Sequence, residues 1–180
     1  MTRLSKPILL LLALAVGGFA PGCGASKEKK MKQLKEYDKE SGPIVRKGFE
    51  SYGKLGWWLS SYQKKEHAKF EKKIGGRLED YKGLIDRMKA VKAPNKELEK
   101  FKENDLKILH AIKDIFKEFK GQLKEGKRPH RNKNVQALEA EYRQRNIKYY
   151  EMRRDYWKKY GKTQKKWKKG KKHKKKKDKW

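Results

Sequence analysis

The sequence has a single cysteine, Cys23, so no disulfide can form within one chain. It lacks the alternation of apolar and polar residues that predicts strands, and it has no glycine-rich phosphate loop, nucleophile elbow or zinc-binding helix motif. The four histidines show no spacing typical of metal ligands: His67, His110, His130 and His173. These absences argue against an enzyme, a metal site and a β-sheet fold. We therefore expect no catalytic residues, no metal and a non-catalytic role.

Acidic residues are few, 22 against 52 lysines and arginines, which gives a formal net charge of +30. Long apolar runs are also missing, with one exception. Residues 1–7 carry Arg3 and Lys6 but no acid, and residues 8–20 are apolar or small. This pattern is typical of a secretory signal, and the run is shorter than the roughly 20 residues that a membrane-spanning helix needs. We expect residues 1–22 to be a signal peptide that is removed.

The signal ends in Ala20-Pro21-Gly22-Cys23. A small residue followed by cysteine resembles the lipobox of bacterial lipoproteins, although Ala20 stands where leucine is usual and Pro21 where a small residue is usual. The resemblance covers only residues 1–24. It implies cleavage before Cys23, a diacylglyceryl group on the Cys23 sulfur and acylation of the new amino group, with no other cofactor. The alternative is conventional cleavage after Ala20, which Pro21 would hinder and which would leave Cys23 as an unpaired thiol.

The same resemblance bears on location. Several acyl chains would anchor the chain permanently to a membrane of the bacterial cell envelope. Gly24 follows the cysteine, whereas inner-membrane lipoproteins of enterobacteria carry aspartate there. The outer membrane, facing the periplasm, is therefore favoured.

The rest of the chain has two possible interpretations. Charged residues make up 41% of the sequence, and Leu, Ile, Val and Phe are scarce, a composition compatible with intrinsic disorder. Against disorder, apolar residues recur every three or four positions, and nine tyrosines and five tryptophans can bury large areas. We expect an all-α fold, an elongated up-down bundle of three or four long helices spanning residues 43–160.

The helix boundaries follow from the apolar stripes and their breaks. Residues 23–42 should hold the lipidated tether and a short helix that ends at Ser41-Gly42-Pro43. A continuous stripe over 43–92 favours one long helix, bent or hinged at Gly75-Gly76. The best amphipathic stripe follows Pro94 and includes Asp105, so this helix should form the centre of the core. A last helix should begin near Val135.

Two local features have alternative explanations. Gly48, Gly53 and Gly56 either allow a neighbouring helix to approach closely or are merely tolerated. Trp57 and Trp58 are about 100° apart on a helix, so both cannot face the core. The exposed one either covers the edge of the bundle or anchors at a lipid interface.

The last 20 residues, 161–180, contain twelve lysines and one acid. We expect this tail to be disordered in isolation because its charges repel. It is either a solubilising tail or a tether for polyanions, which lysines attract electrostatically and aromatic rings can contact by stacking or insertion. The candidate polyanion-binding residues are Lys165, Lys166, Trp167, Lys168, Lys169, Lys171, Lys172, Lys174, Lys175, Lys176, Lys177 and Trp180.

Two functions remain open from the sequence. The first is an envelope-anchored binding or adaptor protein whose tail contacts anionic lipid, lipopolysaccharide or acidic wall polymers. The second is a structural or assembly helper whose bundle docks another protein through exposed aromatics such as Trp57 or Trp58. A nucleic-acid partner is expected only if the chain is not exported.

Overall fold

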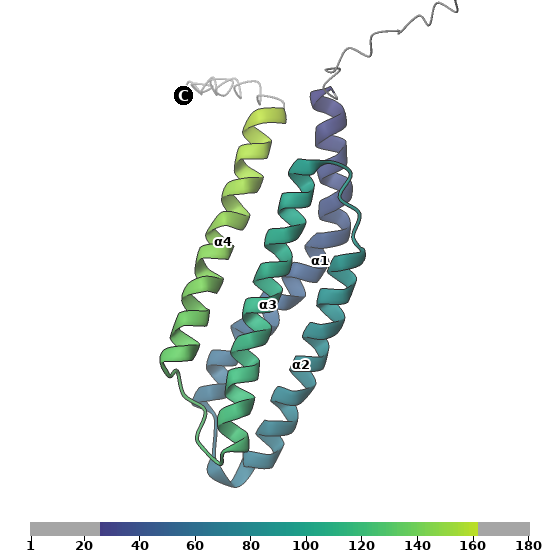
Figure 1. Cartoon of the computed structure of the whole chain (residues 1–180). Coiled ribbons are helices and arrows are strands. Elements are labelled where there is room, and N and C mark those ends of the chain that lie inside the picture. Colours follow the sequence, from purple (N-terminus) through teal and green to yellow (C-terminus); the bar gives the residue numbers. More distant parts are fainter. Residues whose placement is uncertain (1–25, 162–180) are drawn as a thin grey trace, which may run out of the picture.

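The computed structural model describes residues 26–161, in which there are four α-helices and no strand. Consecutive helices run in opposite directions along one elongated bundle (Figure 1). The predicted all-α up-down bundle is therefore confirmed for this part of the chain. The helices are α1 (Lys27–Ser60), α2 (His67–Ala90), α3 (Lys96–Lys124) and α4 (Lys133–Tyr160), with a short 3-10 turn at Lys64–Glu66.

The centre of the core is α3, as its amphipathic stripe predicts. It contributes thirteen buried residues and packs most closely against α2 and α4. Each large apolar side chain that it buries stabilises the fold by about 1.5–3 kcal/mol. In contrast, α4 contributes only three buried residues, Val135, Glu139 and Tyr156. The attachment of α4 therefore depends more on ring contacts and polar bonds than that of α3.

The predicted helix end at Ser41-Gly42-Pro43 is wrong, because α1 continues through all three residues. Pro43 lies on the exposed face of α1, and so does Lys39, whose carbonyl loses its intrahelical bond to the proline. Water can solvate that carbonyl, which lowers the cost of an internal proline. On the opposite face Ser41 is fully buried and connects the apolar stripes before and after it. The boundary predicted between residues 42 and 43 thus falls inside one helix.

The predicted hinge at Gly75-Gly76 is also wrong. Both glycines lie within α2, which is unbroken there. The chain instead reverses after Ser60, where the Ser60 and Ser61 hydroxyls donate to the carbonyls of Trp57 and Trp58 and end α1. The stretch predicted to be one helix is therefore the second half of α1, a turn and α2.

The glycines of α1 differ in how closely a neighbouring helix approaches them, and its two tryptophans differ in burial. A Cβ on Gly48 would lie 2.8 Å from Leu109 Cδ2, and the Tyr81 hydroxyl donates to the Gly48 carbonyl at 2.6 Å, so close approach is the reason for this glycine. A Cβ on Gly53 or Gly56 would meet nothing within 4 Å, so these two are merely tolerated. Trp58 is buried, whereas Trp57 is 68% exposed.

Candidate functional site

The even number of helices places the start of α1 and the end of α4 at the same end of the bundle (Figure 1). We call this the terminal end. Three residues separate Cys23 from Lys27, the first residue of α1, and Gly161 alone separates α4 from the lysine-rich segment 162–180. Both segments lie outside the described residues. The topology nevertheless determines that they join the bundle at one end, which makes this end the candidate functional site.

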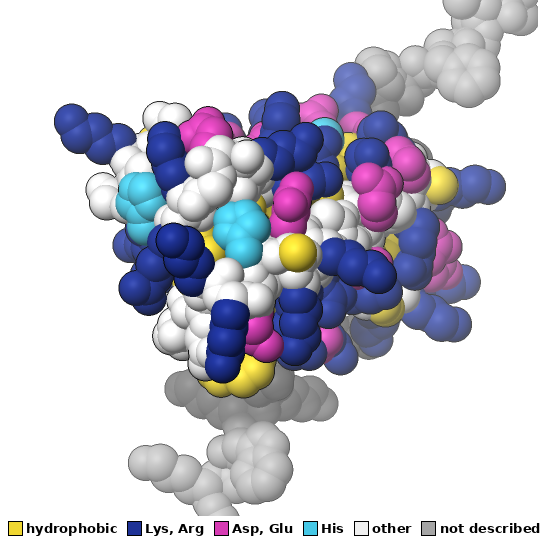
Figure 2. Space-filling model, turned by 90° about the horizontal axis from the view of Figure 1, so that it is seen from below, with side chains coloured by type: hydrophobic (Ala, Val, Ile, Leu, Met, Phe, Trp, Pro, Cys, Tyr) yellow, Lys and Arg dark blue, Asp and Glu magenta, His cyan; other side chains and the backbone are white. Residues whose placement is uncertain are grey.

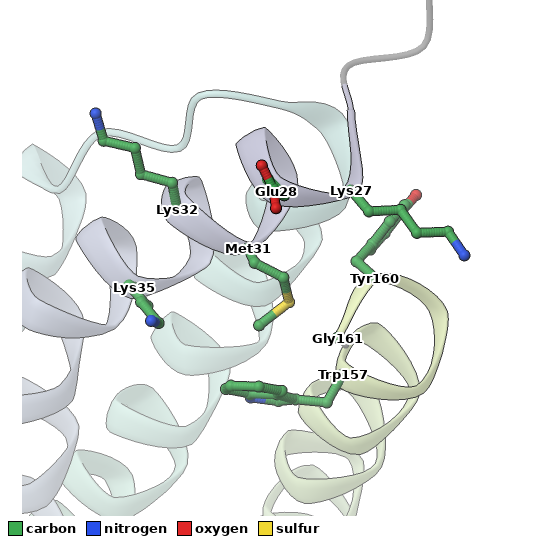
Figure 3. A pocket seen from close by; sticks show the side chains of 8 residues that line it. All are labelled: Lys27, Glu28, Met31, Lys32, Lys35, Trp157, Tyr160 and Gly161. Atoms are coloured by element: carbon green, nitrogen blue, oxygen red, sulfur yellow. The ribbon is translucent and has the colours of Figure 1, made fainter. Parts of the chain in front are cut away.

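The terminal end contains an open cleft of about 730 Å³ between α1 and α4. Its apolar lining comes from Met31 of α1 and from Trp157 and Tyr160 of α4 (Figure 3). The Met31 side chain extends from α1 into the gap, and the Trp157 ring reaches across it from the other side. The remaining lining residues are Lys27, Glu28, Lys32, Lys35 and Gly161. Apolar side chains thus lie beside a cationic rim.

The helical stripes explain why these side chains meet. Met31 is three residues before Leu34, which is buried in the core, so it sits at the edge of the apolar face of α1. On α4, Tyr156 points into the core and is 4% exposed, while its neighbour Trp157 is turned by about 100° and is 51% exposed. The cleft therefore forms where two amphipathic faces separate at the end of the bundle.

A carboxylate at the start of α3 connects three helices beside this cleft. Glu97 accepts hydrogen bonds from Lys30 of α1 at 3.4 Å and from Lys159 of α4 at 2.9 Å, and the Tyr160 hydroxyl donates to it at 2.8 Å. The Tyr156 hydroxyl also donates to the Lys30 carbonyl at 3.1 Å. These bonds close the terminal end and hold the last turn of α4 against α1 and α3.

The surroundings of Glu97 shift its protonation. Partial burial favours the neutral acid, but the hydrogen bonds from Lys159, Tyr160 and Lys30 outweigh it and lower the pKa of this carboxyl below its usual value. The Asn95 side chain caps α3 by accepting from the Glu97 and Leu98 amides. Glu97 is therefore ionised at neutral pH.

Further into the bundle, a buried ion pair connects α4 to α3. Arg153 donates to Asp105 at 3.2 Å, and the Tyr37 hydroxyl of α1 donates to the same carboxylate oxygen at 2.8 Å. Arg153 also pairs with Asp38 at 3.2 Å, and its guanidinium lies 3.7 Å from the centre of the Tyr149 ring. Burial raises the pKa of Asp105, and the neighbouring Arg153 charge opposes this shift. The pair fixes the position of α4, which has few buried apolar residues.

The end of the bundle opposite the terminal end has a different surface. Figure 2 looks at it directly: lysine and arginine side chains protrude all round, acidic side chains lie between them, and hydrophobic atoms show only in small spots. Several surface acids elsewhere pair with cations three residues apart. Examples are Arg77 with Asp80, Lys82 with Glu79 and Lys89 with Asp86.

Most sequence-predicted site residues fall outside the described residues. These are Cys23 and the twelve tail residues from Lys165 to Trp180. Within residues 26–161 no group of three or more His, Cys, Asp or Glu side chains could hold a metal ion, and none of the helices there is apolar enough over its length to cross a membrane. His67 contacts the Tyr62 hydroxyl and the Leu123 carbonyl, both at 2.8 Å, and His110 is exposed.

Sequence reasoning missed the roles of Glu97, Asp105 and Arg153. In the sequence Glu97 is one of several acids near a helix N-terminus, where the helix dipole alone explains it. Asp105 carried a signal, because it occupies an apolar position of the α3 stripe, where an acid needs a buried partner. Nothing in the pattern of α4 distinguished Arg153 from its neighbour Arg154. The cleft itself depends on which helices are adjacent, so no linear motif indicates it.

Comparison of the chain with protein families, with characterised proteins and with solved structures finds no match.

Proposed function

We propose that this chain is an exported, lipid-anchored protein of the bacterial envelope that acts as a non-catalytic binding or adaptor module, with the terminal end facing the membrane. The observation that supports it best is the shared position of the two functional segments. The lipobox-like cysteine and the lysine-rich segment are both connected to the terminal end. This arrangement lets an anchor and an electrostatic contact reach the same surface without the basic segment having to extend along the bundle.

The short tether makes the proposal geometrically specific. Three residue steps separate Cys23 from Ser26, the cap of α1, and span at most about 11 Å. A lipid on Cys23 would therefore hold the first turns of α1 at the headgroups. Exposed lysines cluster in these turns, at Lys27, Lys29 and Lys32, and each would contribute about 1 kcal/mol of attraction to an anionic surface.

The basic segment 162–180 extends this attraction. Lysines act as point charges without the bidentate geometry of arginine, so binding should depend strongly on salt and discriminate poorly among polyanions. Anionic phospholipid, lipopolysaccharide and acidic wall polymers are the accessible polyanions of an envelope.

Two measurements test this function. Mass spectrometry of the membrane fraction of a bacterial host should find Cys23 acylated and residues 1–22 removed. In Cys23→Ser neither the acylation nor the cleavage should occur. Co-sedimentation of residues 23–180, carrying Cys23→Ser, with phosphatidylglycerol vesicles should fall steeply with salt and drop further when 162–180 is removed. Unmodified Cys23, or vesicle binding that is unchanged without 162–180, would contradict the proposal.

A second function is favoured by one specific observation, the exposure of large apolar side chains away from the cleft. Trp57 is 68% exposed on α1, and Ile147 and Tyr150 are 59% and 60% exposed on α4. An assembly helper would use such residues to dock another protein. In that case a protein partner should remain bound without 162–180 and be lost in Trp57→Ala or Tyr150→Ala.

A further inference from the structure

The cleft at the terminal end has the composition of a ligand site. Pockets for small molecules have volumes of about 300–1,000 Å³ and combine apolar walls with a few polar groups, and this cleft of about 730 Å³ is within that range. Its walls are a flexible thioether, Met31, and two aromatic rings, Trp157 and Tyr160. Tryptophan and tyrosine favour the boundary between water and lipid because their rings are apolar with one polar edge.

The rim of the cleft selects the charge of the occupant. Lys27, Lys32 and Lys35 line it against one acid, Glu28. Lys32 lies 4.0 Å from Glu36 across an exposed turn, whereas Lys27 and Lys35 have no acidic partner within 4.0 Å among the described residues. The rim is thus net positive and complements an anion.

Charge also excludes the other candidate occupants. The chain's own segment 162–180 carries twelve lysines, which the rim lysines repel. A second copy would bring its own excess of positive charge to the same place. An occupant that is both apolar and anionic remains, and the tether length places an anionic membrane surface within reach of the cleft.

We propose that the cleft binds one anionic phospholipid of the membrane. An acyl chain of this lipid lies against Met31, Trp157 and Tyr160, and its phosphate lies beside Lys27 and Lys35. This inference rests on the proposed membrane location. It adds a stoichiometric lipid site on the folded bundle to the non-selective attraction of the basic segment.

The test uses residues 23–180 with Cys23→Ser. Isothermal titration calorimetry at physiological salt measures the binding of monomeric dihexanoyl phosphatidylglycerol to this protein. We expect one site. Trp157→Ala should weaken binding by roughly tenfold or more, since the ring supplies much of the apolar contact. Lys27→Gln/Lys35→Gln should weaken it several-fold. Circular dichroism should show that both variants stay folded, because these three side chains are exposed.

Matched controls lie at the opposite end of the bundle. Trp57→Ala removes a tryptophan that is also exposed, and Lys54→Gln/Lys65→Gln removes two exposed lysines; both variants should bind as the parent does. Glycerol phosphate, which lacks acyl chains, and dihexanoyl phosphatidylcholine, which lacks net charge, should each bind several-fold more weakly.

Three results would overturn the proposal: parental affinity in Trp157→Ala, equal binding of glycerol phosphate, or equal binding of phosphatidylcholine. The outcome is separable from that of the proposed function. The calorimetry uses a chain without lipid on Cys23, so a failure here leaves the anchor intact, and an unmodified Cys23 in cells leaves the cleft result intact.

Discussion

At the residue scale, Gly48 and Gly53 form a matched pair on α1. We predict that Gly48→Ala destabilises the fold by about 1–3 kcal/mol, because the new methyl would press on the buried Leu109 side chain. Gly53→Ala should stabilise it by up to about 1 kcal/mol, because the site is open and alanine favours a helix. Urea unfolding of both variants measures the difference. Equal effects of the same sign would contradict the close packing at Gly48.

The buried pair of Asp105 and Arg153 predicts a pH-dependent stability. Arg153→Met should cost about 3–5 kcal/mol near neutral pH, because it leaves the Asp105 carboxylate buried without a counter-charge. The pKa of Asp105, already raised by burial, should rise further. Between the unfolded and folded pKa values only the folded state holds the proton, so stability falls as pH rises through this interval. The loss of unfolding free energy in Arg153→Met, relative to the parent, should therefore be smaller at about pH 4 than at about pH 8.

Urea unfolding at both pH values checks this prediction against two further variants. Arg154→Met, whose side chain is exposed, should change stability by less than about 0.5 kcal/mol. Asp105→Asn/Arg153→Met should recover part of the loss, because no charge is then left unpaired. A deficit in Arg153→Met that is the same at both pH values would mean that the guanidinium acts through packing on Tyr149 alone.

At the element scale, α4 should be the first helix to detach from the bundle, and its detachment should begin at the terminal end. We predict that Glu97→Gln increases amide hydrogen exchange over the last turns of α4, residues 150–160, while the centre of α3 stays protected. The variant weakens the bonds from Lys30, Lys159 and Tyr160 to one carboxylate. The matched control is Glu99→Gln, an exposed acid on the same turn of α3.

The direction of the pH effect at Glu97 follows from its lowered pKa. The ionised carboxylate stabilises the contact fully above the ordinary glutamate pKa, about 4.3, and the contribution is lost as pH falls through the lower folded value. The protection factors of residues 150–160 in the parent, which correct for the intrinsic slowing of exchange in acid, should therefore fall at acidic pH toward those of Glu97→Gln. Identical exchange in Glu97→Gln and Glu99→Gln would show that apolar packing alone holds α4.

Apolar periodicity was sufficient to predict α3 and α4 and the stripe of α1, because these helices bury one face. The errors were a helix end placed at Pro43 and a hinge placed at Gly75-Gly76, because residues that usually end helices lie inside them here, although the apolar stripe correctly continued across the two glycines. Propensity is local, and the burial of Ile44, Val45 and Ile74 on the same helices outweighs it. The true reversal followed Ser60, where the predicted stripe stepped by five residues, from Tyr62 to His67, and so left helical spacing.

At the scale of the whole molecule, the two segments of the candidate site could be predicted from the sequence, but their position at the same end of the bundle could not. A bundle of three helices would place its two ends on opposite sides, and one of four places them together. The reversal at Ser61–Glu66 raises the number of described helices to four, so it decides the arrangement of the terminal end. No feature of residues 1–24 or 162–180 contains that information.

This arrangement predicts how the protein would stand on a membrane if Cys23 is lipidated as proposed. α1 has 34 residues and is about 50 Å long, so its two ends should lie at very different heights. If Cys23 is lipidated as proposed, the one cysteine of the sequence is blocked, and single fluorophores can be placed by Lys29→Cys near the terminal end or Lys65→Cys at the opposite end. Energy transfer to acceptor lipids should be strong from residue 29 and weak from residue 65. Equal transfer from both would mean that the bundle lies flat, with a long face such as that of Ile147 and Tyr150 on the membrane, and the terminal end would then not be the only contact.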